Sequence, residues 1–116
     1  MRKIIVYISG AYTNGGTFKN ILKARDMAIK IWEAGFTPFC PHTNNAYFEN
    51  VCKCTYRDYL EGDIEILKVC SCILMLDNWK ESNGAISEHI EANLNDKPIF
   101  YSLNELIEFY KEKTKC

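Results

Sequence analysis

Lys3-Ile4-Ile5-Val6-Tyr7-Ile8-Ser9 is a short, almost wholly apolar and β-branched run near the start of the chain. A run of this length without polar alternation is typical of a strand covered on both faces, as in a parallel sheet. The loop that follows, residues 10–17, reads Gly-Ala-Tyr-Thr-Asn-Gly-Gly-Thr, and a helical apolar pattern extends over residues 18–34. A buried strand, a glycine-bearing loop and a helix in that order indicate the first unit of an α/β fold.

The same alternation continues along the rest of the chain. Further strands are predicted at residues 36–40, 71–76 and 98–101, and further helices at 55–69, 82–94 and from 102 onward. Gly35 is expected to end the first helix, and the expected N-caps of the later helices are Thr55, Ser82 (or Asn83) and Ser102, the last opening a capping box with Glu105. Residues 41–54 are predicted to form a long polar loop.

Four strand–helix units predict right-handed crossovers and parallel strands. We therefore expect one α/β domain over residues 1–116, three-layered and Rossmann- or flavodoxin-like, with helices on both faces of the sheet. The sheet should hold four to five strands in the order 2-1-3-4. In that order the chain reverses direction between strands 1 and 3, which is where open α/β sheets bind ligands. Residues 9–17 and 77–84 should form the walls of this crevice.

The composition limits the classes of partner. The chain has 116 residues and a formal net charge of −1, which gives no bulk attraction to nucleic acid or to anionic lipid. No apolar run approaches the ~20 residues of a membrane helix, and the apolar start is too short for a signal peptide. We therefore expect a cytoplasmic protein that binds neither a nucleic-acid polymer nor a membrane.

The cysteines leave a zinc site open as an alternative. Cys40, His42, Cys52 and Cys54 could supply four ligands, but zinc ribbons normally leave two to four residues between paired cysteines. Small buried apolar side chains explain the cysteines more simply. We therefore expect neither a metal nor another cofactor.

Several residues near the expected crevice could bind or react. Glycine in the 9–17 loop permits close backbone approach, so its amides could hold an anion, and the start of the 82–94 helix favours phosphate. Carboxylates and histidines could carry acid–base chemistry, and aromatic rings could stack on a base, although each could equally be solvated or part of the core. The candidates are Ser9, Gly10, Tyr12 and Thr13 in the loop; Ser82 and Gly84 at the helix start; Asp58, Asp63 and Glu88; His42 and His89; and Tyr47, Phe48, Tyr56 and Trp79.

Three stretches together resemble the nucleoside 2-deoxyribosyltransferase superfamily, in particular its small phage and bacterial branch. They are Tyr7-Ile8-Ser9-Gly10, the segment from Tyr56-Arg57-Asp58 to Asp63, and Trp79-Lys-Glu-Ser82-Asn-Gly84-Ala85-Ile-Ser-Glu88-His89. The third stretch is the most specific. The chain is also similar to the 2′-deoxynucleoside 5′-phosphate N-hydrolases.

This resemblance implies N-glycosidic bond chemistry on a deoxyribonucleoside or its 5′-monophosphate. It implies that Glu88 attacks the anomeric carbon, that Asp63 protonates the leaving base and that Tyr7 orients the nucleophile. It also implies that Ser82, Gly10 and Gly84 hold a 5′-phosphate, and that the protein is a homo-oligomer. Two alternatives remain: a non-catalytic nucleotide-binding module of the same fold, and a flavodoxin-like or dinucleotide-binding protein, although G-x-G-x-x-G is missing.

Overall fold

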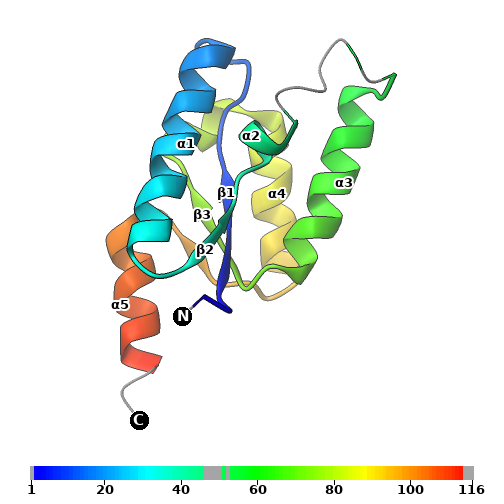
Figure 1. Cartoon of the computed structure of the whole chain (residues 1–116). Helices are drawn as coiled ribbons and strands as arrows, with labels where there is room; N and C mark the ends of the chain where they lie inside the picture. The colour runs from blue at the N-terminus through cyan, green and yellow to red at the C-terminus, as the bar shows by residue number, and fades with distance from the viewer. Residues whose placement is uncertain (1, 46–50, 52, 114–116) are drawn as a thin grey trace.

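The structure is a computed structural model that describes residues 2–45, 51 and 53–113 (Figure 1). Strands and helices alternate along it much as the sequence predicts. The strands are β1 (Ile5–Ser9), β2 (Thr37–Phe39), β3 (Cys72–Met75) and β4 (Ile99–Phe100). The helices are α1 (Thr17–Glu33), α2 (Pro41–Asn45), α3 (Tyr56–Val69), α4 (Asn83–Leu94) and α5 (Leu103–Lys113), with the 3-10 turn η1 (Trp79–Glu81) before α4.

All strand pairs are parallel and the strand order is β2-β1-β3-β4, which confirms the predicted 2-1-3-4 arrangement with four strands. β1 lies inside the sheet, with Tyr7 opposite Phe39 of β2 and Ile73 of β3, and with Ser9 opposite Met75. Successive side chains of a strand point to opposite faces. Val6 and Ile8 therefore face one side of the sheet, and Tyr7 and Ser9 face the other.

Helices cover both faces of the sheet and make three layers. On one face α1 and α5 pack against Val6, Ile8 and Leu74 in an apolar cluster that includes Ile31 and Leu106. On the other face α3 and α4 pack against the sheet in a second cluster, to which Tyr7, Ile73 and Met75 contribute. Figure 1 shows α1 and α5 on one side of the strands and α4 and α3 on the other. On this second face the hydroxyl groups of Tyr7 and Ser9 leave β1 toward α4.

Side-chain caps fix where the helices begin, as predicted for Thr55 and Ser82. The Thr55 hydroxyl accepts a hydrogen bond from the Asp58 N–H at 3.2 Å, and the Asp58 carboxylate accepts one from the Thr55 N–H at 2.7 Å. Ser82 accepts a hydrogen bond from the Ala85 N–H. The capping box predicted at Ser102 is only partly correct, because Glu105 accepts its hydrogen bond from the N–H of Tyr101, one residue earlier.

The prediction of a loop throughout residues 41–54 is wrong at its start, where Pro41–Asn45 form α2. Proline at the first helical position presets the backbone angle and loses no helical hydrogen bond. The Asn44 N–H then donates to the Cys40 carbonyl at 3.0 Å, and the Thr43 hydroxyl donates to the same oxygen. This short helix places the residues after β2 beside the carboxyl end of the sheet. Within the described part of the chain, no helix is long and apolar enough to cross a membrane.

Candidate active site

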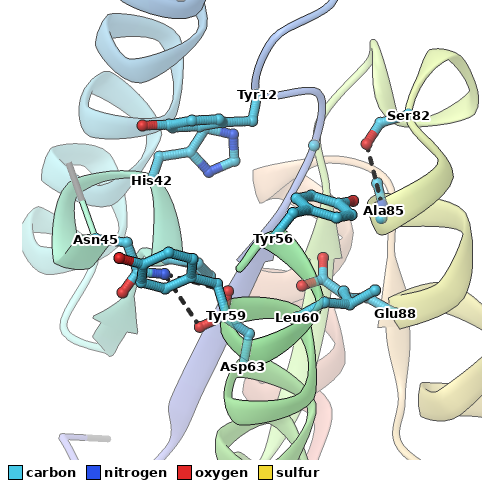
Figure 2. Close-up of a pocket in the computed structure, with 13 residues that line it drawn as sticks. Tyr12, His42, Asn45, Tyr56, Tyr59, Leu60, Asp63, Ser82, Ala85 and Glu88 are labelled. Carbon is cyan, nitrogen blue, oxygen red and sulfur yellow. Dashed lines mark hydrogen bonds between the residues drawn. The ribbon is translucent and has the colours of Figure 1, made fainter. Parts of the chain in front are cut away.

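A cavity opens at the carboxyl ends of β1 and β2, between α2, α3 and the start of α4 (Figure 2). Gly10 and Tyr12 line it from the loop after β1, and Ser82 and Gly84 line it from the loop before α4, as the sequence predicts. α2 and α3 supply further walls that the predicted crevice did not include. Their lining residues are Pro41, His42 and Asn45 on α2, and Tyr56, Tyr59, Leu60 and Asp63 on α3.

Glu88 is the buried carboxylate of this cavity, with 7% of its surface exposed. It lies on α4 and faces the sheet, where two hydroxyl groups of β1 reach it. The Tyr7 hydroxyl donates to Glu88 Oε2 at 2.5 Å, and the Ser9 hydroxyl donates to Oε1 at 2.6 Å. Because Tyr7 and Ser9 are two residues apart on one strand, both side chains leave the same face of the sheet and converge on one carboxylate.

Burial controls the protonation of Glu88 and of Tyr7. Loss of solvent raises the pKa of Glu88 to about 7, while the hydrogen bonds from Ser9 and Tyr7 oppose that rise and the charge of Asp63 adds to it. Burial and the neighbouring Glu88 charge raise the pKa of Tyr7 well above its usual value, so Tyr7 keeps its proton and remains a donor. In the described part of the chain no Lys or Arg forms an ion pair with Glu88.

Asp63 is the second carboxyl group of the cavity. It is partly buried on α3, and burial raises its pKa to about 6. The Asn45 amide nitrogen lies 3.3 and 3.4 Å from its two oxygens, which are long, weak hydrogen bonds that favour the ionised form. Two carboxyl groups in one cavity, both with pKa values moved toward neutrality, are an arrangement typical of acid–base and nucleophilic catalysis.

The amino end of α4 forms the opposite part of the cavity. Ser82 Oγ accepts the Ala85 N–H at 3.1 Å, which leaves the hydroxyl hydrogen of Ser82 available to a ligand. A Cβ at Gly84 would lie 2.5 Å from the Tyr56 hydroxyl, so only glycine admits a group so close to the backbone there. Among the described residues, none accepts a hydrogen bond from the Gly84 N–H. This end of α4 therefore offers donors and a favourable dipole to an anion.

A network of two amide side chains, Asn20 and Asn78, holds the loop after β1, and the sequence analysis missed it. Asn20 donates to the carbonyls of Tyr12 and Asn14 at 2.9 and 2.7 Å, and Asn78 accepts the Ala11 N–H at 3.0 Å and donates to Asn20. Asn20 is only 5% exposed. The sequence feature that could have revealed this network is Asn20 itself, a polar residue four positions before Ala24 on the apolar face of α1.

The same network explains why residue 10 is a glycine. A Cβ at Gly10 would lie 2.7 Å from Leu76 Cδ1 and 2.9 Å from Asn78 Oδ1. The ends of β1 and β3 pack too closely for a side chain at this position. Close packing alone is therefore a sufficient reason for the glycine, and a contact with a ligand is not needed to explain it.

His42 and Tyr12 form the wall opposite Glu88, as Figure 2 shows. Their rings meet edge to face, with centroids 5.4 Å apart. His42 is 5% exposed and its Nε2 lies 2.8 Å from the Ala11 carbonyl oxygen. The possibility that His42 faces the crevice is thus realised.

Other predicted site residues lie elsewhere or have another role. Ser9 is buried and contacts Glu88 rather than an anion site, and Thr13 is exposed outside the cavity lining. Trp79 does not line the cavity, because its ring stacks on His89 at 4.4 Å beside Tyr101. Asp58 is used in the cap of α3. Tyr47, predicted as a possible base-stacking residue, lies outside the described residues, as does Phe48.

No group of three or more His, Cys, Asp or Glu residues in the described ranges could hold a metal ion. Cys40 is buried and Cys54 is exposed, while Cys52 lies outside those ranges. The zinc alternative therefore gains no supporting geometry from Cys40, His42 and Cys54.

Comparison with known proteins identifies the family of this sequence and solved structures with a similar fold. The model of the family described as "Domain of unknown function (DUF4406)" matches residues 4–101. No curated protein matches the chain at a significant level. A solved 2-deoxyribosyltransferase from the psychrotolerant bacterium Bacillus psychrosaccharolyticus, described as a biocatalyst for synthesis of nucleosides, is similar in structure with a TM-score of 0.60 and 20% identity. That match covers 82% of this chain and 69% of the other.

A second similar structure is a 2-deoxyribosyltransferase from Leishmania mexicana, with a TM-score of 0.56 and 13% identity. It is matched over 82% of this chain and 61% of its own length. The fold resemblance predicted from the three sequence stretches is thereby confirmed. The chain belongs to the DUF4406 family and has the fold of the nucleoside 2-deoxyribosyltransferases.

Proposed function

We propose that the protein breaks the N-glycosidic bond of a deoxyribonucleoside or its 5′-monophosphate through a covalent glycosyl-Glu88 intermediate. The observation that carries this proposal is a buried carboxylate held by two hydroxyl groups, from Tyr7 and Ser9, at the wall of a cavity. Burying a carboxylate without a cation lowers the stability of a fold, so such a group indicates a functional site.

Glu88 is arranged as a nucleophile should be. A carboxylate has about four lone-pair positions, and Tyr7 and Ser9 occupy two of them, which fixes the group while leaving electron pairs for the anomeric carbon. The transition state of glycosyl transfer carries positive charge on the sugar, and a poorly solvated carboxylate stabilises that charge strongly. Glu88 would displace the base from the anomeric carbon, and water or a second base would then displace Glu88.

Asp63 is proposed as the acid that protonates the departing base. Its pKa of about 6 keeps part of the population protonated near neutral pH, as a general acid requires. When Glu88 attacks, the electron pair of the glycosidic bond moves to the base nitrogen, and the proton of Asp63 neutralises the base. In the second step the ionised Asp63 can take a proton from the attacking water.

We further propose that the substrate is a 5′-monophosphate bound at the start of α4. The Ser82 hydroxyl and the Gly84 N–H are the donors that support this assignment, together with the helix dipole. With water as acceptor, the products would be a free base and 2-deoxyribose 5-phosphate.

Chromatography of the four deoxynucleosides and their 5′-monophosphates, incubated with the purified protein with and without a second free base, tests this function. We expect free base from monophosphates, and loss of that activity in Glu88→Gln. Glu91→Gln, the same change one turn along α4 and outside the cavity lining, is the control. A new nucleoside that appears only with the second base would show a transferase instead. No product, together with thermal stabilisation by a nucleotide, would overturn catalysis in favour of a binding module.

A further inference from the structure

The tautomer of His42 is fixed by its surroundings. Nε2 lies 2.8 Å from the Ala11 carbonyl oxygen, which can only accept, so Nε2 must carry the hydrogen. Burial lowers the pKa of His42, and the ring is therefore neutral at pH 7. A neutral imidazole with its hydrogen on Nε2 has a bare lone pair on Nδ1. His42 thus presents a hydrogen-bond acceptor, and no donor, at Nδ1.

This acceptor has no partner within the described chain. Nδ1 is buried, and no described residue donates a hydrogen bond to it. Most buried polar atoms of proteins are paired, so an unmet acceptor in a cavity wall indicates a group that arrives from outside. Ala11, which orients the ring, is itself held by Asn78 at 3.0 Å. The acceptor is therefore positioned before any ligand binds.

The position of His42 relates it to the base of the ligand rather than to the phosphate. His42 and Asn45 are one turn apart on α2, and the Asn45 amide reaches Asp63, the proposed acid for the base. The donors at the start of α4, Ser82 and Gly84, lie in the opposite part of the cavity, as Figure 2 shows for Ser82. A nucleotide that presents its base to Asp63 would therefore bring the edge of that base toward α2.

We propose that His42 Nδ1 accepts a hydrogen bond from the exocyclic amino group of the base, so that the site selects cytosine or adenine over uracil or hypoxanthine. This inference rests on the proposed function. Nδ1 is buried in a residue that lines the cavity, so its partner must project beyond the ring of the base, as an exocyclic amino group does. A ring N–H is set back between its neighbours, and a carbonyl oxygen at the amino position would meet the Nδ1 lone pair with no hydrogen between them.

The test compares nucleotides that differ only in this group: deoxycytidine with deoxyuridine 5′-monophosphate, and deoxyadenosine with deoxyinosine 5′-monophosphate. Their dissociation constants are measured by calorimetry on the Glu88→Gln protein, which under the proposed function should not turn them over. We expect the amino-bearing member of at least one pair to bind about tenfold more tightly, since it satisfies a buried acceptor. Adding His42→Leu should bring that ratio to about one.

His89→Leu is the matched control, because His89 is the other histidine of the chain and contacts Trp79 and Tyr101 outside the cavity lining. The ratio should persist in that variant. His42→Leu also removes the contact with Ala11, but this loss weakens both members of a pair alike and cancels in the ratio. Thermal unfolding checks that each variant is folded.

Nitrogen-15 NMR of the histidines gives a second reading that needs no His42 variant. Nδ1 of His42 should carry no hydrogen, and its resonance should move when the preferred amino-bearing nucleotide binds but not when its counterpart without the amino group binds. Equal binding within each pair, or a ratio that survives His42→Leu, overturns the role of His42 and leaves the proposed function standing. A resonance that moves equally with all four nucleotides assigns Nδ1 to a sugar hydroxyl instead. Binding of none of the four overturns the role of His42, while the product assay with all four deoxynucleosides and their monophosphates decides the proposed function.

Discussion

Replacing Tyr7 with Phe removes one hydroxyl group and leaves the ring in place. The ring is fully buried against Phe39, at a centroid distance of 5.7 Å, so Phe retains the packing of the second apolar cluster. The change deletes the 2.5 Å hydrogen bond to Glu88 Oε2 and leaves Ser9 as the remaining hydroxyl donor that the structure gives to this carboxylate. The ionised form of Glu88 should then be less stable, and its pKa should rise further.

The size of this rise follows from the strength of the bond. A hydrogen bond to a charged group contributes about 1.5–3 kcal/mol, and one pKa unit corresponds to about 1.4 kcal/mol. The pKa of Glu88 should therefore move from about 7 to roughly 8–9. At pH 7 the ionised fraction would fall from about one half to about 1–10%, and base release should slow by roughly 5- to 50-fold.

The pH dependence of kcat/KM for base release separates this effect from a general loss. We expect the deficit of Tyr7→Phe relative to the wild type to be largest below pH 7, where the higher pKa leaves less of Glu88 ionised, and to shrink toward none at pH 9–10, where Glu88 is ionised in both proteins. Tyr110→Phe is the matched control, because it removes the hydroxyl group of a tyrosine that packs against Phe36 and Phe100 on the other face of the sheet. It should leave the profile unchanged. A loss that is the same at every pH, or no loss at all, would refute this account of Tyr7.

Three further predictions concern stability. The pKa of Glu88 is raised from 4.5 to about 7 in the fold, so the stability linked to its protonation is complete below pH 4.5 and is lost as the pH rises through 7. At pH 8 the free energy of unfolding of Glu88→Gln, measured with urea, should therefore exceed that of the wild type by up to about 3 kcal/mol, and the difference should shrink toward pH 5. Gly10→Ala should lower the midpoint of urea unfolding because its Cβ meets Leu76, whereas Gly62→Ala, in open space on α3, should raise stability by about 0.5–1 kcal/mol. Asn20→Leu should cost about 1–3 kcal/mol in thermal or urea unfolding, because it leaves the part-buried carbonyls of Tyr12 and Asn14 without their Asn20 donor; an unchanged midpoint would contradict the role of this network.

The regular elements were predictable because each one has a local signal. Unbroken apolar runs identify the buried strands, and Thr55, Ser82 and Gly35 mark helix ends through chemistry that acts within a few residues. α2 was missed because a five-residue helix has no apolar period to detect, and only Pro41 indicates it.

The site was predictable where a residue lies in a sequence motif or, as for Tyr12 and His42, soon after the end of a predicted strand. Glu88, Ser82 and Gly84 belong to the specific stretch around the start of α4, and the structure places them around one cavity with Asp63 and Gly10. The contact of Ser9 with Glu88 depends on a separation of 79 residues along the chain, which no local pattern encodes. Trp79 was assigned to a base because its ring could stack, but His89, ten residues later, takes that face.

The alternation along β1 ties correct folding to the assembly of the site. Tyr7 and Ser9 point to Glu88, while Val6 and Ile8 point to the apolar cluster under α1. If β1 paired with β3 one residue out of step, every side chain of the strand would exchange faces, so a tyrosine hydroxyl and a serine would enter an apolar layer and Glu88 would face two hydrocarbon chains. A misaligned β1 is therefore destabilised on both faces of the sheet. Molecules that keep the native register also have Tyr7 and Ser9 in place beside the Glu88 carboxylate.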